Sequence, residues 1–175
     1  MLLLDQEATI RPADDEDRAA IATFHANSWR DAYRGMLPDA YLAGPVETDL
    51  QEKWANREIT DRDVLLIADL VGELIGFIAV WCRPDPFVDN LHVKPAFRSK
   101  GLGRKLMERA AQDLLENGHS KLSLDVFTTN LRAIAFYEGL GGIRDKQETK
   151  EIFGNPVDLI TIVWPDLLSF PMKIA

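Results

Sequence analysis

One stretch of the chain decides the fold: Leu91-His92-Val93-Lys94-Pro95-Ala96-Phe97-Arg98-Ser99-Lys100-Gly101-Leu102-Gly103. An apolar run typical of a strand breaks at Pro95, and an Arg-x-x-Gly-x-Gly turn then opens a run with helical spacing. The glycines lack the Cβ atoms that would keep an anion away from the backbone amides. The first turn of the helix adds unpaired N–H groups and the positive end of its dipole. The stretch therefore predicts a pyrophosphate-binding loop.

The charges around this loop favour an anionic ligand. Residues 94–109 have a local balance of +5, in a chain whose net charge is −8. The loop is not a Walker loop, because Gly-x-x-x-x-Gly-Lys-Ser/Thr is missing, and Leu106 stands where a dinucleotide fingerprint needs a third Gly or Ala. A lone Gly-x-Gly turn is also consistent with a simple strand-to-helix connection. The charged residues are Lys94, Arg98, Lys100, Arg104, Lys105 and Arg109, opposed by Glu108.

A second segment argues against the purely structural interpretation of the turn. It reads Asn130-Leu131-Arg132-Ala133-Ile134-Ala135-Phe136-Tyr137-Glu138-Gly139-Leu140-Gly141 and follows the alternating run 122–127. Asn130 is suited to cap the N-terminus of a helix, and Gly139 and Gly141 are suited to end it. The chain therefore has a strand, a phosphate-binding helix, another strand and a further helix, in that order.

Together the two segments resemble the GNAT superfamily of acetyl-CoA-dependent N-acetyltransferases. Arg98, Gly101 and Gly103 match the pyrophosphate-loop signature of that family. Gly142 departs from the pattern, because the family usually has an aromatic residue after the Leu-Gly pair, and this affects the expected packing of the next strand. The residues that match the second conserved segment are Asn130, Ala133, Phe136, Tyr137, Leu140 and Gly141.

The resemblance implies one α/β domain over residues 1–175, with a central mixed, twisted sheet of about seven strands flanked by about four helices. Strand, helix and strand form a right-handed crossover, which places ligands beyond the carboxyl ends of the parallel strands. The expected strands are 9–11, 64–70, 74–81, 87–93, 121–127, 143–152 and 157–164. The expected helices are a first one after residues 14–17, then 48–57, 102–117 and 130–138, with a turn-rich segment over 29–38.

The resemblance also implies acetyl-CoA as the co-substrate. The fourth and fifth strands would splay apart, the pantetheine arm would pair with the backbone of residues 91–93 in the gap, and the pyrophosphate would rest on residues 98–104. The predicted cofactor-binding residues are Leu91, His92, Val93, Arg98, Ser99, Lys100, Gly101, Leu102, Gly103, Arg104, Asn130, Ala133 and Phe136.

Transfer of acetyl to an amine needs a group that removes a proton from the amine and a group that protonates the departing thiolate. Tyr137 matches the family's general acid, although it could simply pack beside Phe136. Asp89 is the expected base, on the same alternating strand face as Leu91 and Val93. The alternatives are a solvated role for Asp89, proton transfer through water, and two other bases, His92 on the opposite face and Asp125 on the fifth strand.

The segment that connects the first two helices is expected to select the acceptor amine, chiefly through Trp29 and Tyr33. Residues 1–63 contain fourteen acids and seven bases, which favours a small cationic acceptor such as a polyamine or an aminoglycoside. Trp29 and Tyr33 could instead be core residues. An acetyltransferase of protein N-termini or lysines, with an open groove between the first helical segment and the last hairpin, and a noncatalytic acyl-CoA-binding module remain alternatives. The same segment adds the candidate residues Met36, Tyr41, Asp31 and Asp39.

Composition excludes several other classes. The single Cys82 excludes an internal disulfide and cannot form a cysteine-based metal site without other ligands, and no metal is expected. A pI near 4.9 argues against nonspecific nucleic-acid binding. Met1–Leu4 is apolar but is followed by Asp5 and Glu7, unlike a signal peptide, and no run approaches a membrane span. We expect a soluble, cytoplasmic enzyme, and dimers are common in this family.

Overall fold

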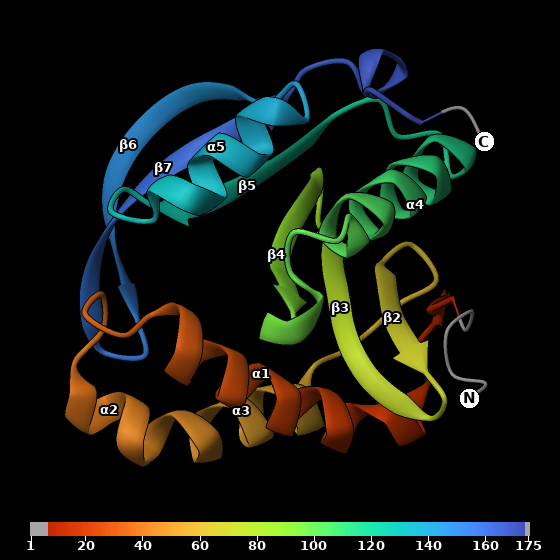
Figure 1. The fold of residues 1–175 in the computed structure, drawn as a ribbon. Helices are drawn as coiled ribbons and strands as arrows, with labels where there is room; N and C mark the ends of the chain where they lie inside the picture. The colour runs from red at the N-terminus through yellow and green to blue at the C-terminus, as the bar shows by residue number, and fades with distance from the viewer. Residues whose placement is uncertain (1–6, 174–175) are drawn as a thin grey trace.

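The computed structural model describes residues 7–173, and within them seven strands form one sheet in the order β1-β2-β3-β4-β5-β7-β6 (Figure 1). The apolar opening, Met1–Leu4, lies outside the described residues. The strands are β1 (Thr9–Pro12), β2 (Val64–Leu70), β3 (Glu73–Cys82), β4 (Pro86–Val93), β5 (Leu122–Phe127), β6 (Ile143–Ile152) and β7 (Asn155–Trp164). The α-helices are α1 (Arg18–Ala32), α2 (Asp39–Ala43), α3 (Pro45–Asn56), α4 (Leu102–Glu116) and α5 (Leu131–Gly139).

The sheet is mixed, as the sequence predicts. Strands β1 to β4 run antiparallel to one another, β4 and β5 are parallel, and β7 pairs antiparallel with both β5 and β6. The single parallel pair is joined by α4, which gives the expected strand-helix-strand crossover. The predicted GNAT-like architecture is therefore confirmed.

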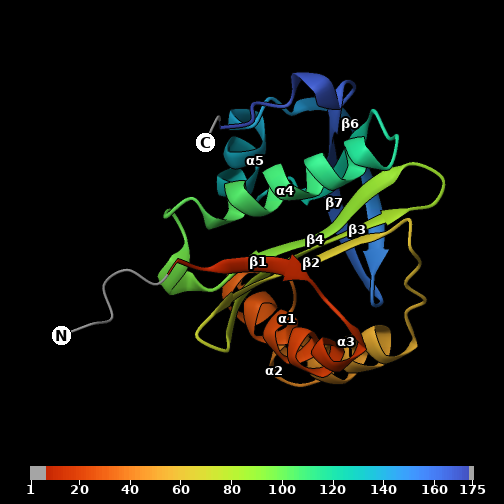
Figure 2. The ribbon, with the colours of Figure 1, turned by 90° about the vertical axis from the view of Figure 1, so that its right-hand side faces the viewer.

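Helices cover both faces of the sheet (Figure 2). Helix α4 lies on one face, where Leu106, Met107 and Leu114 pack into the largest core cluster with apolar residues of β2, β3 and β5. Helices α1 and α3 lie on the other face, where Ile21 and Trp54 pack against β2 and β3. Successive side chains of β2 and β3 therefore enter the cores on opposite faces of the sheet, and both strands are buried over nearly their whole length.

Strands β4 and β5 separate soon after they begin to pair. Their ladder is limited to Phe87 opposite Ser123 and Val88 opposite Leu124. Beyond Val88 the edge of β4 that faces β5 has no strand partner among residues 7–173, and the two ribbons diverge in Figure 1. The predicted splay of these strands is confirmed, and it leaves main-chain groups of β4 available to a ligand.

The helical segments before β2 differ from the sequence-based expectation. Helix α1 continues to Ala32 and includes part of the segment interpreted as turns, and α2 is an additional short helix. Helix α3 begins at Pro45, three residues before the expected start, because proline fits the first turn of a helix. No helix within residues 7–173 is long and apolar enough to cross a bilayer.

Candidate active site

A cavity of about 930 Å³ lies where β4 and β5 diverge. Its walls come from both strands, the end of α1, the loop before α4, the helix α5 and the tip of the β6–β7 hairpin. The predicted catalytic and cofactor-binding residues line it except Lys100 and Leu102, and so do the two chief acceptor-binding residues. The residues that line it are Trp29, Tyr33, Asp89, Leu91, His92, Val93, Arg98, Ser99, Gly101, Gly103, Arg104, Asn130, Ala133, Phe136 and Tyr137.

Lys100 and Leu102 do not line the cavity. Leu102 is the first residue of α4 and is buried in the main core, with 6% of its surface exposed. Lys100 is exposed, and its ammonium lies over the Phe97 ring at 5.6 Å from the centroid. Lys100 and Leu102 can therefore contribute to the predicted cofactor site through their backbones, which belong to the same loop, and this role stays a prediction.

The loop before α4 has the backbone that the two glycines suggested. Gly101 has φ +83° and is the N-cap of α4, and Ser99 also has a positive φ of +61°. A Cβ on Gly103 would lie 3.4 Å from Cζ of Phe136 and 3.8 Å from Cγ2 of Val93, two residues of the cavity wall. The missing side chain at 103 keeps this wall open beside the first amides of α4, so the loop fits a pyrophosphate.

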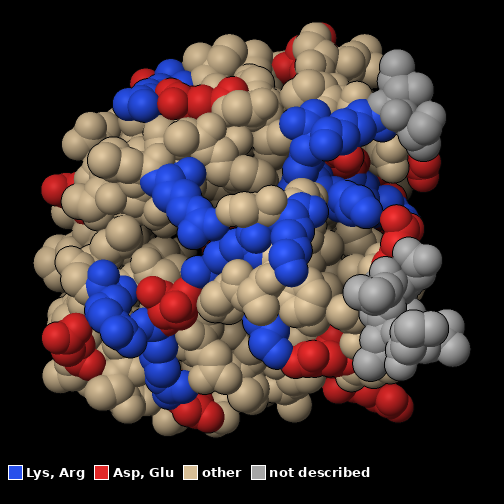
Figure 3. Space-filling view, viewed as in Figure 1, with Lys and Arg blue, Asp and Glu red and all other residues tan. Residues whose placement is uncertain are grey.

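Basic side chains gather over the middle of the face shown in Figure 3. Arg98, Arg104 and Arg132 line the cavity. The Arg98 guanidinium donates through Nε to the Val93 carbonyl at 3.0 Å and through Nη1 to Asp31 at 2.5 Å. Arg104 donates to Glu108 at 2.7 Å and to the Pro171 carbonyl at 2.5 Å. The chain itself therefore holds these two arginines beside the loop.

Tyr137 lies on α5 and forms part of the cavity wall. The helix begins after Asn130, whose side-chain oxygen accepts from the Ala133 N–H at 3.2 Å, as a capping residue does. The Tyr137 ring meets Phe136 and Trp164 edge-on, at centroid distances of 5.2 and 6.1 Å. Burial raises the pKa of the Tyr137 hydroxyl above its ordinary value, so the phenol is a proton donor at neutral pH.

The prediction that Asp89 shares a face with Leu91 and Val93 is wrong. The β3–β4 ladder pairs Ala79 with Asn90 and Val80 with Val88, so Asp89 is the extra residue of a β-bulge. A bulge breaks the alternation of side chains between the two faces of a strand. The Asp89 side chain consequently turns toward α3.

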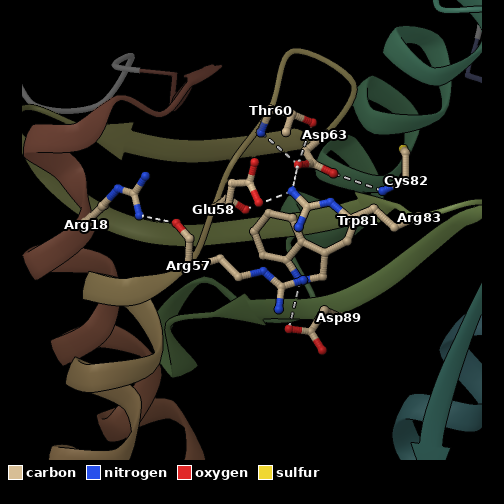
Figure 4. A network of polar contacts seen from close by, with 9 residues as sticks. All are labelled: Arg18, Arg57, Glu58, Thr60, Asp63, Trp81, Cys82, Arg83 and Asp89. Carbon is tan, nitrogen blue, oxygen red and sulfur yellow. Dashed lines mark hydrogen bonds and ion pairs between the residues drawn. The ribbon is translucent and has the colours of Figure 1, made fainter.

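Three donors converge on Oδ2 of Asp89. They are Nζ of Lys53 at 2.9 Å, Nε1 of Trp81 at 3.0 Å and Nδ2 of Asn90 at 2.9 Å. The Trp81 ring carries the Arg57 guanidinium, whose carbon lies 4.2 Å from the ring centroid (Figure 4). Burial opposes ionisation, but Lys53 and the other donors outweigh it and lower the pKa of Asp89 below its ordinary value. Asp89 is therefore a fixed carboxylate at neutral pH.

The other two candidate bases are held differently. His92 faces α1, opposite to Leu91 and Val93, and its Nδ1 lies 2.9 Å from Oγ of Ser28. Burial lowers the pKa of His92 to about 3, so its ring is neutral. Asp125 accepts from Oγ1 of Thr161 at 2.7 Å and from Nζ of Lys150 at 2.6 Å, one bond to each carboxylate oxygen.

The acceptor end of the cavity contains residues that the sequence did not single out. Trp29 and Tyr33 line it as expected, whereas Met36, Asp39 and Tyr41 do not. The buried Tyr41 instead donates to Asp49 at 2.9 Å. The unexpected wall residues include Lys53, Lys150, Glu151 and Phe153. The sequence predicts the hairpin whose tip carries Phe153, but no local pattern indicates which residues that tip contacts.

Comparison with known proteins agrees with this geometry. The sequence profile of the Acetyltransferase (GNAT) family matches residues 26–141, which include both motifs. The chain belongs to the GNAT acetyltransferase family. Its GNAT relatives include the uncharacterized N-acetyltransferase YuaI of Bacillus subtilis, 28% identical over 91% of this chain and 94% of that protein. An uncharacterized N-acetyltransferase of Archaeoglobus fulgidus is 32% identical over 73% of this chain and 88% of that protein.

Solved GNAT structures share the fold. The structure of yncA from Salmonella typhimurium with its cofactor acetyl-CoA has a TM-score of 0.66 at 22% identity, and the match covers 96% of this chain and 98% of that chain. This relative confirms acetyl-CoA as a co-substrate within the family to which the chain belongs. At this level of identity the likeness establishes the fold and leaves the acceptor open.

Proposed function

We propose that the protein transfers acetyl from acetyl-CoA to a primary amine of a small cationic molecule. The proposal that the acceptor is small rests on the position of Phe153, at the tip of the β6–β7 hairpin. Its ring lies 6.1 Å from that of Trp29 and 6.3 Å from that of Tyr41, centroid to centroid. These contacts bridge the hairpin to α1 and α2, where a polypeptide acceptor would need an open groove.

The chain's own residues would hold the co-substrate in two places. The amides of residues 98–104 and the side chains of Arg98 and Arg104 suit the pyrophosphate. Backbone groups of Leu91 to Val93, which have no β5 partner, suit the amides of the pantetheine arm. When bound, acetyl-CoA supplies the thioester.

Tyr137 serves as the acid in this proposal. Its phenol keeps its proton at neutral pH and lines the cavity, so it can donate that proton to the departing sulfur. Asp89 draws the acceptor's ammonium toward its second oxygen and orders a water that carries the proton to the solvent, because its lowered pKa makes Asp89 itself a weak base. His92, with a pKa of about 3, is less suited to this role. Asp125 is also less suited, because each of its two carboxylate oxygens already accepts a hydrogen bond.

The charges at the acceptor end favour a cation. Three carboxylates, Asp89, Asp125 and Glu151, line this part of the cavity together with two ammonium groups, those of Lys53 and Lys150. Aromatic faces of Trp29 and Tyr33 stand beside them, and such faces attract cations. A protonated amine gains from both features, whereas an acidic amine meets a surplus of negative charge.

A screen of acceptors tests the proposal, with release of the free thiol from acetyl-CoA as the readout. Polyamines and aminoglycosides are expected to give transfer, and neutral or acidic amines little. Peptides with a free N-terminus or an internal lysine serve as the matched macromolecular panel. Acetylation of the peptides with inert polyamines and aminoglycosides would identify a protein acetyltransferase instead. Binding of acetyl-CoA without transfer to any amine would identify a noncatalytic module.

A further inference from the structure

The indole of Trp164 lies directly beside Tyr137. Trp164 is the last residue of β7, is 3% exposed, and meets the Tyr137 ring edge-on at 6.1 Å with an interplanar angle of 84°. Its Nε1 donates to the carbonyl of Leu140, the residue that ends α5, at 2.9 Å. Trp164 therefore fixes both the ring of Tyr137 and the end of the helix that carries it.

Gly142 makes room for this indole. A Cβ at position 142 would lie 2.9 Å from Cζ2 of Trp164, 2.9 Å from the Tyr137 carbonyl oxygen and 2.5 Å from Cγ2 of Ile162. Real Cβ atoms do not approach other atoms so closely, and two of these neighbours are buried in the core. The positions of Trp164 and Ile162 therefore require glycine at 142.

We propose that Trp164 is a positioning residue that holds the Tyr137 phenol at the cavity wall for transfer of its proton. This inference rests on the proposed function. The edge contact restricts rotation of the Tyr137 ring, and the bond to Leu140 prevents α5 from shifting along β7. A general acid must stand within hydrogen-bond reach of the atom that it protonates, so a small displacement of the ring slows the chemical step.

The surroundings of Tyr137 also give the inference a spectroscopic signature. Burial raises the pKa of its hydroxyl, and the nearby Tyr33 on the other side of the cavity adds to the effect. Glu138, the next residue on α5, pairs with Arg144 at 2.5 Å on the exposed side of the helix. Removal of the indole admits water to the phenol, so the pKa of Tyr137 falls toward its ordinary value of about 10.

The test replaces the indole in two steps, Trp164→Phe and Trp164→Leu. Phe170→Leu is the matched control, because Phe170 packs against Trp164 at 6.1 Å and belongs to the same buried core. Thermal unfolding identifies variants that remain folded at the assay temperature. The readouts are kcat and KM for acetyl-CoA against the best acceptor, the pH profile of kcat, and tyrosinate absorbance. The chain has three tyrosines, so a Tyr137→Phe reference isolates the signal of Tyr137.

We expect kcat to fall about 10- to 100-fold in Trp164→Leu, less in Trp164→Phe, with KM for acetyl-CoA little changed. The alkaline loss of kcat and the Tyr137 titration should both move to lower pH, and Phe170→Leu should shift neither. Folded Trp164 variants with wild-type kcat and an unmoved titration would overturn the inference. Failure of the proposed function would look different, because the wild-type protein would then transfer acetyl to no amine.

Discussion

At the scale of single residues, the two proposed reacting groups meet opposite environments. Burial keeps the Tyr137 phenol protonated, while Lys53, Trp81 and Asn90 keep Asp89 ionised. Each group is therefore in the form that its role needs at neutral pH, a proton donor on one wall and an anion on the other. Pairs of titratable groups whose pKa values are pushed apart are typical of acid–base catalysis.

Replacement of Tyr137 by Phe tests this assignment most directly. The change removes one hydroxyl and keeps the ring contacts with Phe136 and Trp164. Turnover should fall roughly 10- to 1000-fold with acetyl-CoA affinity nearly intact, the range for loss of a general acid. Stopped-flow rates measure the chemical step, and calorimetry measures the affinity. Tyr41→Phe is the matched control, since Tyr41 does not line the cavity. An unchanged chemical step in Tyr137→Phe would leave Tyr137 a packing residue.

At the scale of elements, strand β4 shows what a sequence can and cannot predict. Period-two alternation correctly separates His92 from Leu91 and Val93, because the strand is regular there. It fails at Asp89, because a bulge adds one residue on one strand only and leaves no periodic trace in the sequence. The same limit applies to Phe153 and Trp164. The hairpin that carries Phe153 and the strand that carries Trp164 are predictable, but the contacts of both residues depend on how the whole sheet twists and packs.

Two substitutions in the turn between β4 and α4 should weaken acetyl-CoA binding for different physical reasons. Gly103→Val adds methyl groups between Val93 and Phe136 and should weaken acetyl-CoA binding at least about 10-fold by steric exclusion. Arg98→Glu should weaken it comparably by charge reversal at the cavity wall. Lys105→Glu makes the same change in net charge at an exposed site outside the cavity and should have a much smaller effect. Unchanged calorimetric affinity in the first two variants contradicts the assigned phosphate site.

The β6–β7 hairpin predicts a change of specificity. Phe153→Ala removes the ring that contacts Trp29 and Tyr41. Alanine has a Cβ as phenylalanine does, so the substitution does not relieve the backbone strain of the positive φ at position 153. The ratio of kcat/KM for a bulky amine to that for a small amine should rise roughly 10-fold. Leu168→Ala, at another exposed apolar residue outside the cavity, should leave the ratio unchanged. An unaltered ratio in Phe153→Ala means that the hairpin tip does not set the size of the acceptor.

At the scale of the whole molecule, two charge distributions oppose each other. The chain carries a net charge of −8, which repels a polyanion such as acetyl-CoA, while residues 94–109 carry +5 around the phosphate loop. In ordinary salt, exposed charges act over roughly 8–10 Å. A ligand at the loop therefore responds mainly to the local basic surface of Figure 3, and a ligand at the acceptor end responds to its own nearby carboxylates.

Ionic strength distinguishes the local fields from the net charge. Raising salt from about 50 mM to about 500 mM should weaken binding of acetyl-CoA severalfold and raise KM for a cationic acceptor, because screening removes attraction at both ends of the cavity. An uncharged pantetheine fragment, which lacks the phosphates, is the control and should bind with little dependence on salt. Calorimetry over this series gives the affinities, and initial rates give KM. If acetyl-CoA instead binds more tightly as salt rises, long-range repulsion by the acidic remainder of the chain governs its capture, and the basic residues around Gly101 and Gly103 do not form the field assigned to them.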